Sequence, residues 1–195
     1  MKARTIAAVV FGSWLVSAGP VSAQDAAPQS GSSRPGAIRD TSAHTRPMGI
    51  SGMLYLPWYY GIGIGLNARF EIPVVHDGFI PAINDQFSIE PSLSLGYRSR
   101  KYGWADDRLT FFDITPAVYG TWSFHITPKF RPYAALGLGY DIGIWLNDSD
   151  YARDVTAGFF YWDTAVGLFY SFSPHVAFRG ELGAQGPKAG LSVLF

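Results

Sequence analysis

QFSIEPSLSLGYR, residues 86–98, alternates between two kinds of side chain. Large apolar residues and one proline occupy every second position from Phe87 to Tyr97, and small or polar residues occupy the positions between them. Successive side chains of a β-strand point to opposite faces, whereas a helix repeats every 3.6 residues. The stretch therefore predicts a strand with one apolar face and one polar face.

The same period of two runs from Met48 to the end of the chain and is clear again over 132–147. Pro91 and Pro116 fall inside this pattern and cannot donate a ladder hydrogen bond, so we expect a bulge or kink at each. Past the first 23 residues, no stretch approaches 18 consecutive apolar positions, which excludes membrane-spanning helices. The pattern predicts eight strands, at 48–57, 60–75, 86–98, 108–125, 131–146, 157–171, 175–185 and 188–195.

The less apolar face of these strands distinguishes a membrane barrel from a soluble one. A face exposed to water would carry Lys, Glu and Thr, but this face is mostly Gly, Ser and Ala, which fit the narrow interior of an eight-stranded barrel. We therefore predict an all-β fold, an eight-stranded antiparallel up-and-down transmembrane β-barrel over 48–195. The small residues are Gly61, Gly63, Gly65, Ser88, Ser92, Ser94, Ala117, Gly137, Gly139, Ala165, Gly167 and Ser171.

The positions of the lysines and of the aromatic residues also favour a membrane barrel over a soluble one. Lys101, Lys129 and Lys188 fall in expected loops, turns or at a strand edge, which avoids the ~2–4 kcal/mol cost of a charge facing the bilayer midplane. Aromatic residues gather near both ends of the strands, where the two membrane interfaces favour them. They are Trp58, Tyr59, Tyr60, Tyr97, Tyr102, Trp104 and Tyr151 at one end, and Phe70, Phe124, Phe130, Phe172 and Phe195 at the other.

The last eight residues, KAGLSVLF, read polar-x-Gly-x-x-apolar-x-apolar and end on Phe195. This ending resembles the C-terminal signal of bacterial outer-membrane barrels, and residues 48–195 are similar in architecture to the small OmpA/OmpX-type barrels. The resemblance implies a Gram-negative outer-membrane location, contact with outer-membrane lipid and lipopolysaccharide, and recognition of the last strand by the barrel assembly machinery. An even strand count puts both termini on the periplasmic side.

The N-terminal region has a different composition. Residues 1–23 carry a basic start, an apolar core over 6–18 and small residues at 21–23, as a cleaved signal peptide does. Residues 24–47 are rich in Ala, Ser, Pro and Gly and predict a flexible periplasmic leader. Without the signal, 13 basic and 15 acidic residues remain, a balance that argues against a nucleic-acid surface. The chain has no Cys, which excludes disulfides and thiol chemistry.

Most charges of the expected strands fall on the interior face. Buried charges are tolerated when they are paired, so we predict a network of ion pairs and hydrogen bonds that plugs the barrel, with Arg69 and Arg179 paired to carboxylates across the lumen. The alternative is a narrow pore that favours cations, because acidic groups exceed arginines. The predicted network comprises Arg69, Glu71, Glu90, Arg98, Asp113, Asp141, Asp163, Arg179 and Glu181, with Asn67, Tyr119, His125 and Gln185 beside it.

We predict no enzyme activity. Eight-stranded barrels that modify lipid A rely on a His with a hydroxyl partner near the outer end. Here His44, His76, His125 and His175 fall in the leader or at periplasmic ends. The acidic segment 147–150, with Asp154, offers oxygen atoms to Ca²⁺ but lacks the Gly and distal Glu of an EF-hand, so we predict no metal and no cofactor.

The pattern as a whole favours a monomeric, non-enzymatic outer-membrane protein with a structural or surface-interaction role. A narrow pore for ions or small solutes is the alternative, and lipid A modification comes third. The connection 76–85 is long for a periplasmic turn, and a periplasmic partner would use it or the leader. Residues 98–101, RSRK, begin an outer loop that is either solvated or in contact with lipopolysaccharide phosphates.

Overall fold

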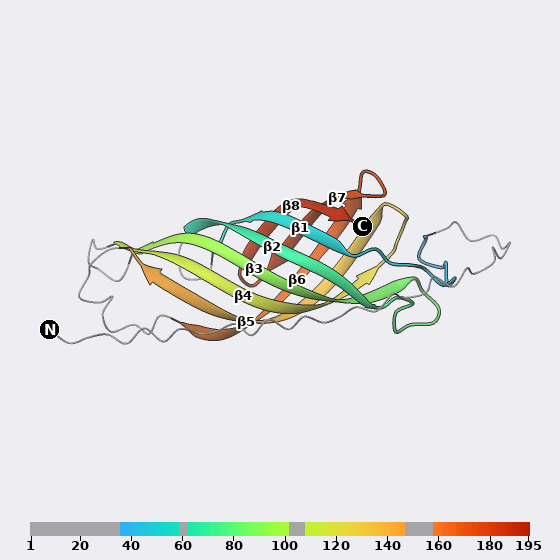
Figure 1. Cartoon of the computed structure of the whole chain (residues 1–195), viewed down its shortest axis with the longest axis horizontal. Coiled ribbons are helices and arrows are strands. Elements are labelled where there is room, and N and C mark those ends of the chain that lie inside the picture. The colour runs from blue at the N-terminus through green and yellow to red at the C-terminus, as the bar shows by residue number, and fades with distance from the viewer. Residues whose placement is uncertain (1–35, 59–61, 102–107, 147–157) are drawn as a thin grey trace. The chain divides into compact units, whose positions relative to one another are not determined.

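The computed structural model describes residues 36–58, 62–101, 108–146 and 158–195. Within these ranges each of eight strands pairs antiparallel with the next, and the last pairs with the first, which closes a barrel (Figure 1). The predicted all-β, eight-stranded up-and-down fold is thus confirmed, with strand ends within three residues of expectation. The strands are β1 (Gly49–Tyr55), β2 (Ile62–Val75), β3 (Asp85–Lys101), β4 (Arg108–Phe124), β5 (Phe130–Trp145), β6 (Phe159–Ser171), β7 (Val176–Gly183) and β8 (Gly186–Leu194).

The seam between β1 and β8 closes the barrel. β1 pairs along its whole length with β2 and with β8, in the latter case from Gly49 opposite Leu194 to Tyr55 opposite Lys188. The backbone N–H of Phe195 also donates to the carbonyl of Met48 at 2.9 Å. We call the end of the barrel that holds this bond the terminal end, and the other the opposite end.

Alternate side chains of each strand enter the barrel. In β1, Ser51, Met53 and Tyr55 are buried, whereas Ile50 and Leu54 between them are exposed on the outside. This alternation is the predicted period of two, because a strand places successive side chains on opposite faces. None of the described residues forms a helix long and apolar enough to cross a membrane.

The bulges expected at Pro91 and Pro116 are not where the strands shift. Both prolines lie in an unbroken β3–β4 register. The second neighbour of the strand is β2 for Pro91 and β5 for Pro116. On that side of each proline, the pairing skips two positions and resumes in the same register. Each proline thus loses local pairing on the side where its N–H is missing. A register shift falls instead between Pro73 and Val75 in β2.

Four interior tyrosines lie over glycines that stand directly opposite them on the neighbouring strand. A Cβ added to Gly137 would lie 2.4 Å from the Tyr119 ring, and one added to Gly167 would lie 2.4 Å from the Tyr133 ring. The small residues of the interior face therefore make room for rings as well as narrowing the barrel. The four pairs are Tyr55–Gly65, Tyr119–Gly137, Tyr133–Gly167 and Tyr161–Gly139.

Residues 36–47 fold against the connection between β2 and β3. The backbone N–H of Asn84 donates to the carbonyl of Ile38 at 2.8 Å, and the carbonyl of Asn84 accepts from the N–H of His125 at 2.9 Å. The Asp40 side chain accepts from the N–H of Gly36 at 2.7 Å. These contacts differ from the flexible leader expected over 24–47. Residues 24–35 and the expected signal peptide lie outside the described residues.

The long connection 76–84 packs on the outer face of the barrel rather than inside it. The Phe79 ring contacts those of Phe87 and Trp122, with centroid separations of 5.5 and 6.1 Å. Asp85, the first residue of β3, accepts a hydrogen bond from the Trp122 indole at 2.7 Å. These contacts give the connection an apolar anchor on the outside of the barrel.

Candidate functional site: the polar interior of the barrel

Six charged side chains from β2, β3, β6, β7 and β8 meet inside the barrel, and we call them the central network. Three are cations and three are carboxylates, so their formal charges cancel. Each is at most 5% exposed. The members are Arg69, Glu90, Asp163, Arg179, Glu181 and Lys188.

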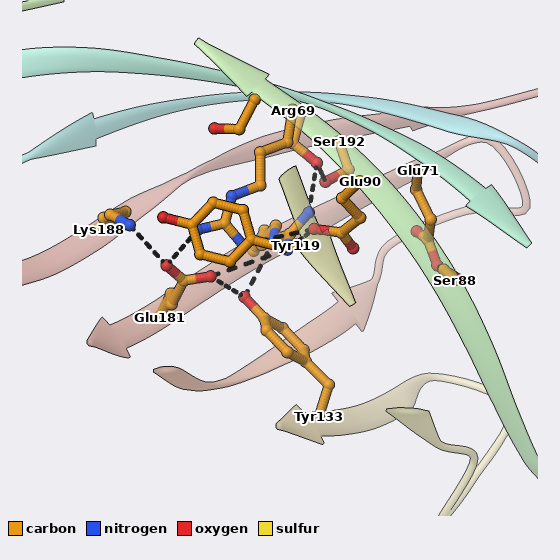
Figure 2. A network of polar contacts seen from close by, with 12 residues as sticks. Arg69, Glu71, Ser88, Glu90, Tyr119, Tyr133, Glu181, Lys188 and Ser192 are labelled. Carbon is orange, nitrogen blue, oxygen red and sulfur yellow. Dashed lines mark hydrogen bonds and ion pairs between the residues drawn. The ribbon is translucent and has the colours of Figure 1, made fainter. Parts of the chain in front are cut away.

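Each carboxylate of the central network contacts at least one cation. Glu90 receives Arg179 at 2.7 Å and Arg69 at 3.4 Å. Glu181 receives Arg69 at 2.7 Å and Lys188 at 2.9 Å. Figure 2 shows Lys188 directed at the carboxylate of Glu181. Two of these ion pairs join β7 to β2 and β3 across the lumen, and the other two join the neighbouring strands β2–β3 and β7–β8.

Tyrosines complete the hydrogen bonding of the central network. The Tyr133 hydroxyl donates to Glu181 at 2.8 Å and accepts from Arg179 Nε at 3.0 Å, as Figure 2 shows for Glu181. The Tyr119 hydroxyl donates to Asp163 at 2.9 Å, and its ring centroid lies 3.7 Å from the Arg69 guanidinium carbon. Charge-assisted bonds and cation–π contacts offset part of the cost of removing these ions from water.

A second polar layer lies toward the opposite end of the barrel. Arg98 pairs with Asp113 at 2.9 Å and with Asp141 at 3.7 Å. The Tyr55 hydroxyl donates to Asp113 at 3.0 Å, and Thr115 donates to Asp141 at 3.1 Å. Arg98 thus points into the barrel, as predicted for the network, and residues 98–101 continue β3 rather than begin an outer loop.

A third polar layer lies toward the terminal end. Arg131 contacts both oxygens of Glu71 at 2.8 Å, a bidentate pair. Gln86 donates to Glu71 at 2.8 Å and contacts His125 Nε2 through its carbonyl at 2.9 Å. Burial and the nearby charges of Arg131 and Arg46 lower the pKa of His125 to about 2. A neutral His125 donates a hydrogen bond here and is a poor general base near neutral pH.

All nine residues of the predicted network lie buried inside the barrel. The structure divides them among three layers: Glu71 at the terminal end, Arg98, Asp113 and Asp141 toward the opposite end, and the other five in the centre. Asn67 and Tyr119 are buried beside them. Segments 102–107 and 147–157, which include the acidic residues considered for Ca²⁺, lie outside the described residues.

Sequence reasoning missed two charged members of these layers. Lys188 was expected at a strand edge, but its side chain is fully buried and pairs with Glu181. Arg131 was expected at the start of a strand and was not included in the network. Position parity is the signal that finds both, because Lys188 shares the inward face of β8 with Ser192 and Arg131 shares that of β5 with Tyr133.

The histidines of the described residues lie in the connections at the terminal end of the barrel or among residues 36–47. His76, His125 and His175 follow or precede strands at the terminal end, and His44 lies among residues 36–47. Across the part of the chain that the structure describes, no group of three His, Asp or Glu side chains is arranged to hold a metal ion.

No family model and no curated protein matches the sequence. Among solved structures, a de novo designed transmembrane β-barrel is similar with a TM-score of 0.46 and 12% identity, over 79% of this chain and 100% of that one. The outer-membrane protein Ail of Yersinia pestis in a phospholipid nanodisc is similar with a TM-score of 0.46 and 13% identity, over 77% of this chain and 100% of that one. The crystal structure of Ail, the attachment invasion locus protein, gives 0.43 and 15% identity, over 77% and 96%.

Proposed function

We propose that the protein is an integral β-barrel of the bacterial outer membrane with a non-enzymatic structural or surface-interaction role and a plugged lumen. The observation that carries this proposal is the charge-balanced central network, in which Arg69, Arg179 and Lys188 face three carboxylates with almost no exposure. A lumen filled by these ion pairs stabilises the barrel and leaves no path for solutes.

The outer face of the barrel supports the membrane location. Its exposed side chains include large apolar residues on every strand, such as Ile64, Leu138, Phe160, Trp162 and Leu182. In water, a continuous apolar surface of this kind would drive association, whereas in a bilayer it contacts lipid at no such cost. We therefore infer a monomer in contact with outer-membrane lipid and lipopolysaccharide.

The C-terminal strand supports assembly in the outer membrane. β8 runs to Leu194, and the exposed Phe195 ring lies 6.1 Å from that of Phe70 on the outside of the terminal end. We infer that the barrel assembly machinery recognises this strand. The terminal end would then face the periplasm, and the opposite end would face the cell exterior.

The energetics of the central network favour a plug over the alternative of a narrow pore. Removing one partner from a buried ion pair costs about 3–5 kcal/mol, because the other charge is left uncompensated. An open lumen would require Glu90 and Glu181 to lose contacts with both arginines, so opening would meet this cost at several positions at once.

Single-channel recording in a planar bilayer tests this proposal. The protein lacking residues 1–23 would be refolded, and its folded state confirmed by a heat-dependent shift on a gel. We expect insertion without conductance steps. Stable and reproducible steps from the unmodified barrel would overturn the plug and favour the pore. Flotation with outer-membrane vesicles after expression tests the location separately.

A further inference from the structure

The mouth of the barrel at its terminal end holds a cavity with cations on its walls. It has a volume of about 410 Å³, which lies within the range of small-molecule sites. Arg46, His125, Lys129 and Arg131 line it, and none of the described residues that line it is Asp or Glu. We call this cavity the basic vestibule. Its lining includes Phe169, whose ring centroid lies 4.0 Å from the Arg131 guanidinium carbon.

Arg46 brings a charge to the vestibule that no described carboxylate contacts directly. Its guanidinium donates through Nε to the carbonyl of His76 at 3.1 Å and through Nη2 to the amide oxygen of Asn84, and both acceptors are neutral. Arg46 also lines a neighbouring hollow with Asp77, Asp40 and Asp85, whose charges act on it, but no ion pair joins Arg46 to any of these three residues. Arg46 is thus held in place by hydrogen bonds to neutral groups and lies between the vestibule and an acidic hollow.

Like charges face each other across the vestibule. The charge of Arg131 is matched by the buried Glu71, but no described carboxylate forms an ion pair with Arg46 or with the exposed Lys129. Burial and the charge of Arg131 lower the pKa of Arg46. His125 also stays neutral between these cations and His44. Burial is the largest cause of both shifts, and the charge of Arg131 adds to each.

We propose that the basic vestibule binds an oxyanion of the phosphate or carboxylate type, held by Arg46 and Lys129 at the rim. An oxyanion here would relieve the repulsion between cations and gain charge-assisted hydrogen bonds in a partly desolvated cavity. Its source is either a free anion or the phosphate of a lipid headgroup, since both present the same oxygen atoms. The site belongs to the folded mouth of the barrel and is independent of whether the lumen conducts.

Histidine NMR of the folded full-length barrel tests the site. The protein in zwitterionic detergent at pH 7 would be titrated with inorganic phosphate and then with succinate, and the side-chain resonances of His125 followed. We expect a saturable shift, because an anion beside Arg46 changes the field at His125. Arg46→Gln and Lys129→Gln should each weaken the apparent affinity roughly tenfold, the loss of one charge-assisted hydrogen bond.

A matched control is Arg39→Gln, which removes an exposed charge of the leader that does not line the cavity. It should leave the titration unchanged. Lys129→Gln keeps the proposal testable if Arg46→Gln fails to fold. The Lys129 side chain is exposed and its backbone hydrogen bonds remain in the variant, so Lys129→Gln should fold normally. The shift in His125 should still be present in both variants at saturating anion.

Nanodiscs distinguish the two sources of the anion. A shift in phosphatidylglycerol nanodiscs that is absent from nanodiscs of a glycolipid without phosphate, without any response to free anions, would assign the site to lipid headgroups. A response to free phosphate in detergent would assign it to a soluble anion. No saturable shift in any arm, or equal affinities for Arg46→Gln, Lys129→Gln and the unmodified protein, would overturn the proposal.

Discussion

Lys188 and Glu181 stand directly opposite each other on β8 and β7, with Nζ and Oε1 2.9 Å apart and neither side chain exposed. Lys188 also reaches Asp163 on β6 at 3.6 Å. A single cation therefore pairs with two carboxylates from two other strands. Next to the seam where β8 meets β1, this arrangement ties the last strand to the polar interior and not only to its neighbours' backbones.

Lys188→Met should destabilise the barrel by about 3–5 kcal/mol, because it leaves the central network with an unmatched buried carboxylate. Urea unfolding in lipid vesicles, followed by tryptophan fluorescence, measures the change. The double variant Lys188→Met/Asp163→Asn restores neutrality and should recover most of the loss. If Lys188→Met were as stable as the unmodified barrel, Lys188 would not be a necessary member of the network.

Gly137→Ala should destabilise the barrel by about 1–3 kcal/mol through overpacking, since the new Cβ would lie 2.4 Å from the Tyr119 ring. Gly143 on the same strand is the matched control, because a Cβ there meets nothing within 4 Å. Gly143→Ala should be neutral or slightly stabilising, as glycine weakens strand interiors. Equal unfolding midpoints for the two alanine variants would refute the packing of Tyr119 over Gly137.

The strands and the interior charges could be predicted from sequence because both depend on one local rule. A strand alternates its faces, so the parity of Glu90 or Arg179 within its strand decides that it points inward. The same rule places Lys188 inside. The prediction for Lys188 was wrong because the cost of a charged side chain in a membrane holds for a residue that faces lipid, whereas parity directs Lys188 into the barrel.

The packing of Tyr119 over Gly137 could not be predicted, because it depends on strand register. Two glycines in neighbouring strands look alike until the pairing shows which of them stands opposite a tyrosine. Register follows from turn geometry and from the fit of the whole barrel. The same holds for Phe79, whose contacts with Phe87 and Trp122 join residues that no local pattern links.

Lowering the pH from 7 to 5 should destabilise the barrel partly through His125. Its pKa is about 2 in the folded state against 6.5 as the reference value, so below pH 6.5 the unfolded chain binds a proton that the native state excludes. That difference amounts to about 2 kcal/mol between pH 7 and pH 5. Urea midpoints of the unmodified protein and His125→Gln at both pH values measure it, and identical pH dependence in the two proteins would contradict the assignment.

Arg179→Ala/Glu90→Ala should turn the closed barrel into a conducting one. The two side chains form a 2.7 Å ion pair between β7 and β3, and both are fully buried, so their joint removal empties part of the lumen without leaving an unpaired charge between them. Water entering this polar space would hydrate Arg69 and Glu181 and allow ions to pass. Single-channel recording should show steps for the double variant and none for the unmodified protein.

The exterior variant Leu138→Ala is a suitable control for that experiment, since Leu138 is exposed on the outside of β5 and touches no part of the lumen. It should stay silent. A double variant that folds, as judged by its heat-dependent gel shift, and still fails to conduct would mean that another layer, such as Arg98 with Asp113, closes the barrel. Adding Arg98→Ala would then identify that layer, because steps should appear when the last closing ion pair is removed.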